Sequence, residues 1–144
     1  MTRRARLLTL ITSSAALALL SACAGTRSVT FEVIGKDGAP VQGAHVMAVR
    51  LNTGSTPLPL NDATIEEILL TGKASEQAWT DAQGVVRLAL APDRPHLVQA
   101  HPPMFSREAD ENPRPARYRL DPDAKSLTPV ESGASWAGEV RLKP

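Results

Sequence analysis

Three histidines, His45, His96 and His101, are the side chains best suited to metal binding or acid–base chemistry in this 144-residue chain. His96 and His101 lie five positions apart in one predicted strand, and an odd spacing places them on opposite faces of that strand. They therefore do not hold one ion together, and His45 approaches one of them only if the two strands are neighbours. We expect surface or rim histidines and no metal site.

The other catalytic patterns are incomplete. Gly54-Ser55 lacks the strand–turn–helix context of a nucleophilic serine. Glu66 and Glu67 are adjacent on a predicted helix, so their carboxylates point in different directions and do not form an acid–base pair. The chain contains neither a phosphate-binding loop nor a dinucleotide-binding fingerprint. These observations favour a protein without enzymatic activity and without a cofactor, with an unrecognised hydrolase as the weaker alternative.

Cys23 is the only cysteine of the chain, so it has no partner for an internal disulfide. It follows three arginines at positions 3, 4 and 6 and an uncharged stretch over residues 7–20. That stretch is shorter than the roughly 20 apolar residues of a membrane-spanning helix. A basic start, a short apolar run and small residues are typical of a cleaved secretory signal peptide, here residues 1–22.

The end of this segment, Leu20-Ser21-Ala22-Cys23, resembles the bacterial lipobox. The resemblance implies that the signal is cut before Cys23, and that acylated Cys23 attaches the mature protein to a lipid bilayer. Ala24 follows in place of the Asp that marks inner-membrane retention, so we expect the outer membrane of the cell envelope, facing the periplasm. An ordinary soluble export signal and a spanning segment are the alternatives.

The charge balance changes when the leader is removed. Three of the 16 basic residues and none of the 15 acidic ones lie in residues 1–22, which leaves 13 basic residues and a formal charge of −2. No basic patch remains for binding nucleic acid. With Cys23 lipidated, no cysteine remains for thiol catalysis or for a disulfide. The core must therefore hold by burial alone. Residues 23–28 form the lipidated cysteine and a short tether.

Residues 29–144 are expected to form one β-rich domain. Alternating stretches between Gly/Pro turns predict strands at 29–34, 45–51, 77–80, 85–90, 96–101, 118–120, 127–130 and 136–142. A helical insertion is predicted near 61–72, capped by Asn61 or Asp62 and with a stripe that lies on the domain, formed by Ile65, Ile68 and Leu69. Residues 102–115 are predicted to be a loop. The fold class is therefore all-β, a Greek-key β-sandwich of about seven strands.

Six residues suit tight turns or close backbone approach: Asp37, Gly38, Pro40, Gly43, Asp81 and Gly84. The stretches GKDGAPVQGAHV over 35–46, TDAQGVVRL over 80–88 and HLVQAHPPMF over 96–105 resemble, in order, the signatures of carboxypeptidase regulatory-like, transthyretin-related domains. The resemblance implies a Greek-key sandwich of seven or eight strands. The Pro-Gly-aromatic of that family is replaced by Pro102-Pro103-Met104-Phe105, and residues after 105 match by strand pattern only.

Enzymes of related topology need residues that this chain lacks. Transthyretin-like hydroxyisourate hydrolases end in Tyr-Arg-Gly-Ser, and intradiol dioxygenases bind iron with two tyrosines and two histidines; this chain ends in RLKP and has only Tyr118. The resemblance thus implies a non-catalytic structural or protein-interaction module with an envelope protein as partner. The alternative is a small-ligand or glycan-binding lipoprotein that uses its loops, Trp79 or Trp136, although we expect Trp79 in the core.

The lipobox resemblance makes a direct prediction. Replacing the acylated residue, Cys23→Ala, removes the only thiol that can take up lipid, so the variant should incorporate no labelled fatty acid and should accumulate as unprocessed precursor. Metabolic labelling with a fatty acid, followed by gel electrophoresis, measures both outcomes. A wild-type protein that takes up no label would contradict the prediction.

Overall fold

The computed structural model describes residues 25–51, 61–71, 76–111, 114–130 and 136–144. The lipobox residues 20–23, Gly54-Ser55 and the expected helix end at Gly72 lie outside this part of the chain. Strand β1 begins at Arg27, so the last two residues of the expected tether belong to the sheet.

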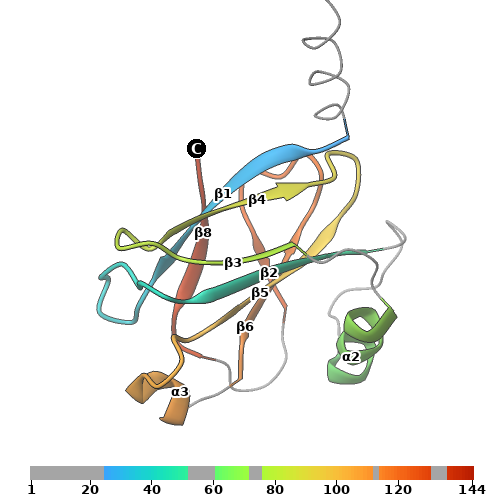
Figure 1. Ribbon diagram of the computed structural model, residues 1–144. Helices are drawn as coiled ribbons and strands as arrows, with labels where there is room; N and C mark the ends of the chain where they lie inside the picture. The colour runs from blue at the N-terminus through green and yellow to red at the C-terminus, as the bar shows by residue number, and fades with distance from the viewer. Residues whose placement is uncertain (1–24, 52–60, 72–75, 112–113, 131–135) are drawn as a thin grey trace, which may run out of the picture.

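Two antiparallel sheets pack face to face as a sandwich (Figure 1). The first has the order β4-β1-β8 and the second the order β3-β2-β5-β6-β7. The strands are β1 Arg27–Ile34, β2 His45–Arg50, β3 Glu76–Trp79, β4 Val85–Leu90, β5 His96–His101, β6 Ala116–Leu120, β7 Thr128–Pro129 and β8 Glu139–Lys143. The predicted all-β sandwich is confirmed, with eight strands among the described residues. Helix α2, Asp62–Thr71, is the insertion, and a second helix, α3, Arg107–Glu111, replaces part of the expected loop.

The main core lies between the sheets and follows the two-residue period of the strands. Phe31 and Val33 on β1 are fully buried, and so is Val46 on β2. Alternate residues of the partner strands complete this cluster: Ala48, Val86, Leu88, Leu90, Val98, Ala100, Leu120 and Val140. Because one face of each strand packs inward, the apolar positions recur at every second residue.

Strand β5 is buried on both faces, unlike the other strands. Helix α2 covers part of the outer face of the second sheet, where Ile65 packs with Leu97 of β5 in a second apolar cluster. Ile68 and Leu69 pack against the same cluster, so the apolar stripe of the helix lies on the domain. Leu51, at the end of β2, is also buried there, which explains why the faces of this strand are not cleanly separated in the sequence.

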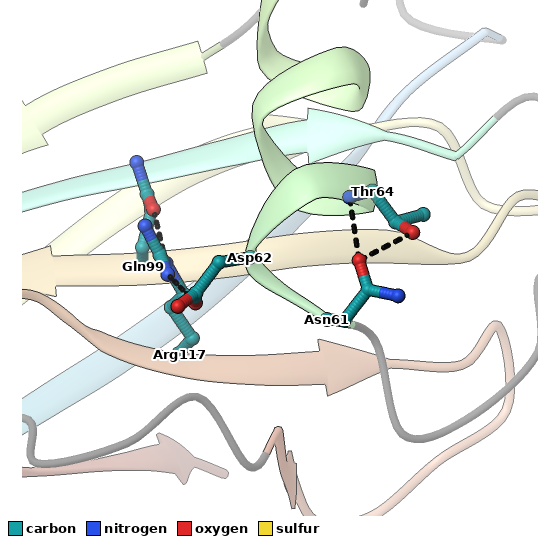
Figure 2. A network of polar contacts seen from close by, with 5 residues as sticks. All are labelled: Asn61, Asp62, Thr64, Gln99 and Arg117. Atoms are coloured by element: carbon teal, nitrogen blue, oxygen red, sulfur yellow. Dashed lines mark hydrogen bonds and ion pairs between the residues drawn. The ribbon is translucent and has the colours of Figure 1, made fainter.

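Polar contacts fix the position of helix α2 (Figure 2). Oδ1 of Asn61 accepts hydrogen bonds from the backbone N–H and the hydroxyl of Thr64, both at 2.8 Å, so Asn61 is the N-cap. From the first turn, Asp62 contacts Arg117 of β6 at 3.2 Å. The Nε of Arg117 donates to the amide oxygen of buried Gln99 at 3.1 Å. The helix start is therefore tied to two neighbouring strands.

Thr80 joins the two segments in which the chain crosses between the sheets. Its backbone N–H donates to the carbonyl of Ala44 at 2.9 Å, and its carbonyl accepts from Gly43 N–H at 3.0 Å. Its hydroxyl accepts from Ala44 N–H at 2.9 Å and donates to the carbonyl of Val41. Thr80 is buried, so these four bonds satisfy all of its polar groups away from water.

The turn after Thr80 fits against the end of β1. Asp81 Oδ1 accepts two backbone N–H groups of its own turn, at 2.9 and 3.0 Å. Gly84 has a φ of 73°, and a Cβ at this position would lie 2.7 Å from the Val33 carbonyl oxygen and 2.9 Å from the Pro40 Cβ. Only glycine combines that backbone conformation with that closeness.

The neighbouring turn uses similar chemistry in more open surroundings. Asp37 Oδ1 accepts the N–H of Ala39 at 3.1 Å. Gly38 and Gly43 have φ values of 81° and 78°. A Cβ on Gly38 would have no atom within 4 Å, so the left-handed backbone alone favours glycine there.

The closing segment joins the sheets at the opposite side of the core. Val140 N–H of β8 donates to the hydroxyl oxygen of Tyr118 on β6 at 3.1 Å. Burial raises the pKa of Tyr118, so the hydroxyl stays protonated at neutral pH. Trp136 is buried just before β8, and a Cβ on Gly138 would lie 2.5 Å from its ring. Because Gly138 has no Cβ, the indole of Trp136 can pack directly against the backbone at this position.

Two glycines with similar φ angles give a matched test of the close packing at the crossing. Gly84→Ala places a methyl group against the β1 backbone and should lower the free energy of unfolding by about 3 kcal/mol. Gly38→Ala adds only the cost of the left-handed conformation, about 1 kcal/mol. Urea unfolding of the two purified variants measures the difference. Equal denaturation midpoints would show that Gly84 is not tightly enclosed.

Candidate functional site

The structure brings two of the three histidines together. His45 on β2 lies directly opposite His101 on β5 in the antiparallel register, and their ring centroids are 5.9 Å apart. His96 lies at the other end of β5, where it is buried, so the prediction of a surface or rim histidine is wrong for this residue. The approach of His45 to His101 depends on the adjacency of β2 and β5, which the sequence pattern did not specify.

Trp79 extends this row onto the edge strand β3. It pairs with His45 in the register, and the two ring centroids are 5.1 Å apart. Oε1 of Gln77, also on β3, accepts a hydrogen bond from His45 Nε2 at 2.9 Å. The row Trp79–His45–His101 thus runs across three adjacent strands on the outer face of the second sheet.

The prediction that Trp79 belongs to the core is wrong. Its side chain is 64% exposed, whereas Trp136 is 4% exposed and fills the core. Trp79 shares the outward face with His45, and it sits on an edge strand, away from the apolar cluster under helix α2. Of the two tryptophans, only Trp79 can therefore stack on a partner or ligand.

The imidazoles of His101 and His96 favour the neutral form. Burial lowers the pKa of His101, and the neighbouring His45 and Arg117 lower it further. Burial also lowers the pKa of His96; the cations Arg50 and Arg27 act in the same direction, against a hydrogen bond at Arg94. His101 and His96 are therefore mostly uncharged at pH 7.

The chemistry available in the row is stacking and hydrogen bonding. In the described parts of the chain, no group of three His, Cys, Asp or Glu side chains is placed to hold a metal ion. The row offers one exposed indole, two imidazoles and the amide of Gln77. Such groups suit recognition of a planar or apolar surface.

Two further exposed side chains lie at the same end of the sandwich. Met104 is 78% exposed and Phe105 is 95% exposed, in the loop that follows His101. The backbone of Phe105 has a φ of 63°, which is uncommon for a residue with a side chain of this size. We call Trp79, Met104 and Phe105 the exposed patch.

Contacts with the crossing segments place the loop of the exposed patch. A Cβ on Gly43 would lie 3.8 Å from the Cβ of Pro103, which directly precedes Met104. Gly43 itself is hydrogen-bonded to Thr80, the neighbour of Trp79. The sequence predicted a loop here and a departure from the family pattern, but not the exposure of its side chains. That departure, Pro-Pro-Met-Phe, was the available signal for the exposed side chains.

The exposed patch lies at the end of the sandwich where β1 finishes. Strand β1 starts at Arg27 and ends at Ile34, close to the crossing segments (Figure 1). Its eight residues span roughly 26 Å, so the patch is separated from the start of the domain by the length of the strand. Among the described residues, no helix has the length and apolar character needed to cross a membrane.

No protein-family model matches the chain, and comparisons with curated proteins and with solved structures find no match either.

Proposed function

We propose that this protein is a non-catalytic lipoprotein of the bacterial cell envelope, anchored through acylated Cys23, whose sandwich presents the exposed patch to another envelope protein. One observation carries the proposal. Of the four large hydrophobic side chains that are strongly exposed in the described residues, three form the exposed patch, and all three lie away from the lipobox end of the domain. The fourth is Leu70 on helix α2.

The distances suit presentation away from a membrane. Arg27 follows Cys23 by four residues, which extend at most roughly 14 Å. Strand β1 adds roughly 26 Å along its own direction. An anchored domain therefore holds the exposed patch within roughly 40 Å of the bilayer and pointing into the periplasm, where a partner protein can reach it.

Burial against a protein gives these side chains a physical role. Covering apolar surface stabilises a complex by about 25 cal/mol per Å². Tryptophan is enriched among the residues that dominate binding energy at protein interfaces. Trp79 is well suited to this role because its strand and its contact with His45 hold the indole in place before binding. Less ordering is then needed when a partner docks.

Glycan binding is a second candidate, favoured by the polar neighbours of Trp79. An exposed indole next to Gln77, His45 and His101 can stack on a sugar ring while amide and imidazole groups bond its hydroxyls. Met104 and Phe105 have no hydrogen-bonding side-chain groups and nevertheless expose most of their surface. They favour an apolar protein surface over a sugar.

Photo-crosslinking in living cells tests the proposal. A benzoylphenylalanine at position 105 or 79 should form an adduct of defined mass with an envelope protein, because both positions would lie in the interface. The same group at position 87 is the matched control, since Arg87 is exposed on β4 of the other sheet. Adducts should be absent there. Mass spectrometry of the adducts identifies the partner.

The double variant Trp79→Ala, Phe105→Ala distinguishes loss of the exposed patch from loss of the fold. Both side chains are mostly exposed, so its melting temperature should stay close to that of the wild type. A benzoylphenylalanine at position 104 of this variant should lose the adduct. Equal adducts at positions 87 and 105, or none at all, would contradict a protein partner. Saturable quenching of Trp79 fluorescence by saccharides would then support the glycan candidate.

A further inference from the structure

An open groove of about 530 Å³ lies at the end of the sandwich opposite the exposed patch. It is formed by the start of β1, the loop between β6 and β7, and the end of β8. Its apolar lining comes from all three segments: Val29, Leu120, Ala124 and Leu142. Leu120 belongs to the main core, and Val29, Ala124 and Leu142 are partly buried against it, so the floor of the groove is the edge of that core.

The lining also carries three positive charges and no acidic side chain. Arg27 starts β1, Lys125 lies in the loop, and Lys143 ends β8. The Nε of Arg27 is buried and has no hydrogen-bond partner among the described residues. Asp121, in the same loop, is already paired with Arg119 at 2.9 Å. Three basic side chains without an acidic one among the lining residues favour an anionic occupant of the groove.

The groove is placed beside the predicted anchor. Arg27 lies four residues after Cys23 and starts β1, whereas the exposed patch adjoins the crossing segments at the other end of this strand. An anchored protein would therefore hold Arg27 within roughly 14 Å of the acylated residue. At that distance the groove lies within reach of the headgroup region of the bilayer.

We propose that the groove binds the phosphate headgroup of an anionic phospholipid from the membrane in which Cys23 is anchored. This rests on the proposed lipid attachment. Arg27, Lys125 and Lys143 hold the phosphate, and the first acyl carbons lie against the partly buried Val29, Ala124 and Leu142. A single acylated residue on a short tether leaves the domain free to rotate. Headgroup binding adds a second contact with the membrane and so fixes the tilt of the domain.

The mixed lining favours a lipid over a free anion. Inorganic phosphate would use the three cations but would leave the apolar lining in water. A phospholipid satisfies both parts, since its phosphate and its acyl chains are joined in one molecule. Basic residues close to a bilayer are also attracted by anionic lipids, and this attraction falls off within a Debye length.

The test uses the full-length lipidated protein in nanodiscs. Amide hydrogen exchange in peptides covering residues 27–30 and 142–144 should be about tenfold slower in discs of phosphatidylcholine with phosphatidylglycerol than in phosphatidylcholine alone. The double variant Lys125→Gln, Lys143→Gln should lose this difference. Both lysines are exposed, so the fold should survive, which a melting curve checks. Lys36→Gln removes an exposed charge in the turn after β1, at the other end of the strand, and should keep the difference.

Several results would overturn the proposal. Equal exchange in the two kinds of disc would mean that apolar contacts alone, such as the acyl chain on Cys23, cover the groove. The same slowing by inorganic phosphate in phosphatidylcholine discs would mean a site for free anions. Absence of fatty-acid label on Cys23 would overturn the anchor and this proposal together, whereas a labelled protein whose exchange ignores phosphatidylglycerol would overturn the groove alone.

Discussion

Four hydrogen bonds at Thr80 hold together the two segments in which the chain passes from one sheet to the other. Residues 35–44 lead from β1 to β2, and residues 80–84 lead from β3 back to β4, so the segments run between the same two sheets. Thr80 bonds to Val41, Gly43 and Ala44 through its backbone and its hydroxyl. Each such bond contributes about 1 kcal/mol, and a lost partner would leave a buried polar group unsatisfied.

This junction gives the sandwich two unlike ends. At the junction lie the turns and the exposed patch, with Trp79 next to Thr80 and Phe105 in the adjoining loop. At the other end lie Arg27, the basic groove and the predicted attachment to lipid. Strand β1 runs from one end to the other, so a single element sets their separation. Under the proposed function, one end would face the membrane and the other would present the exposed patch to a protein.

The sequence was sufficient to predict the strands that bury one face only, because their pattern is local. Alternation gave the inward residues Phe31 and Val33, and the Gly/Pro turns separated most strands, because one face of each packs on the core. The surroundings of Trp79 and His101 depended on neighbours distant in the chain. Their exposure and pairing follow from the order β3-β2-β5 and from how far helix α2 extends over the sheet, which no local pattern encodes. Helix α3, of five residues, is too short for a detectable period.

Tryptophan quenching in vesicles tests the central claim most directly, namely that the exposed patch points away from the membrane in which we propose that Cys23 is anchored. Trp136 is buried, so the Trp79→Phe variant isolates the signal of Trp79. Acrylamide in the buffer should quench Trp79 in the reconstituted lipidated protein, whereas nitroxide-labelled phospholipids should not. Strong quenching of Trp79 by the labelled lipids, with little by acrylamide, would place the patch in the bilayer and contradict the account.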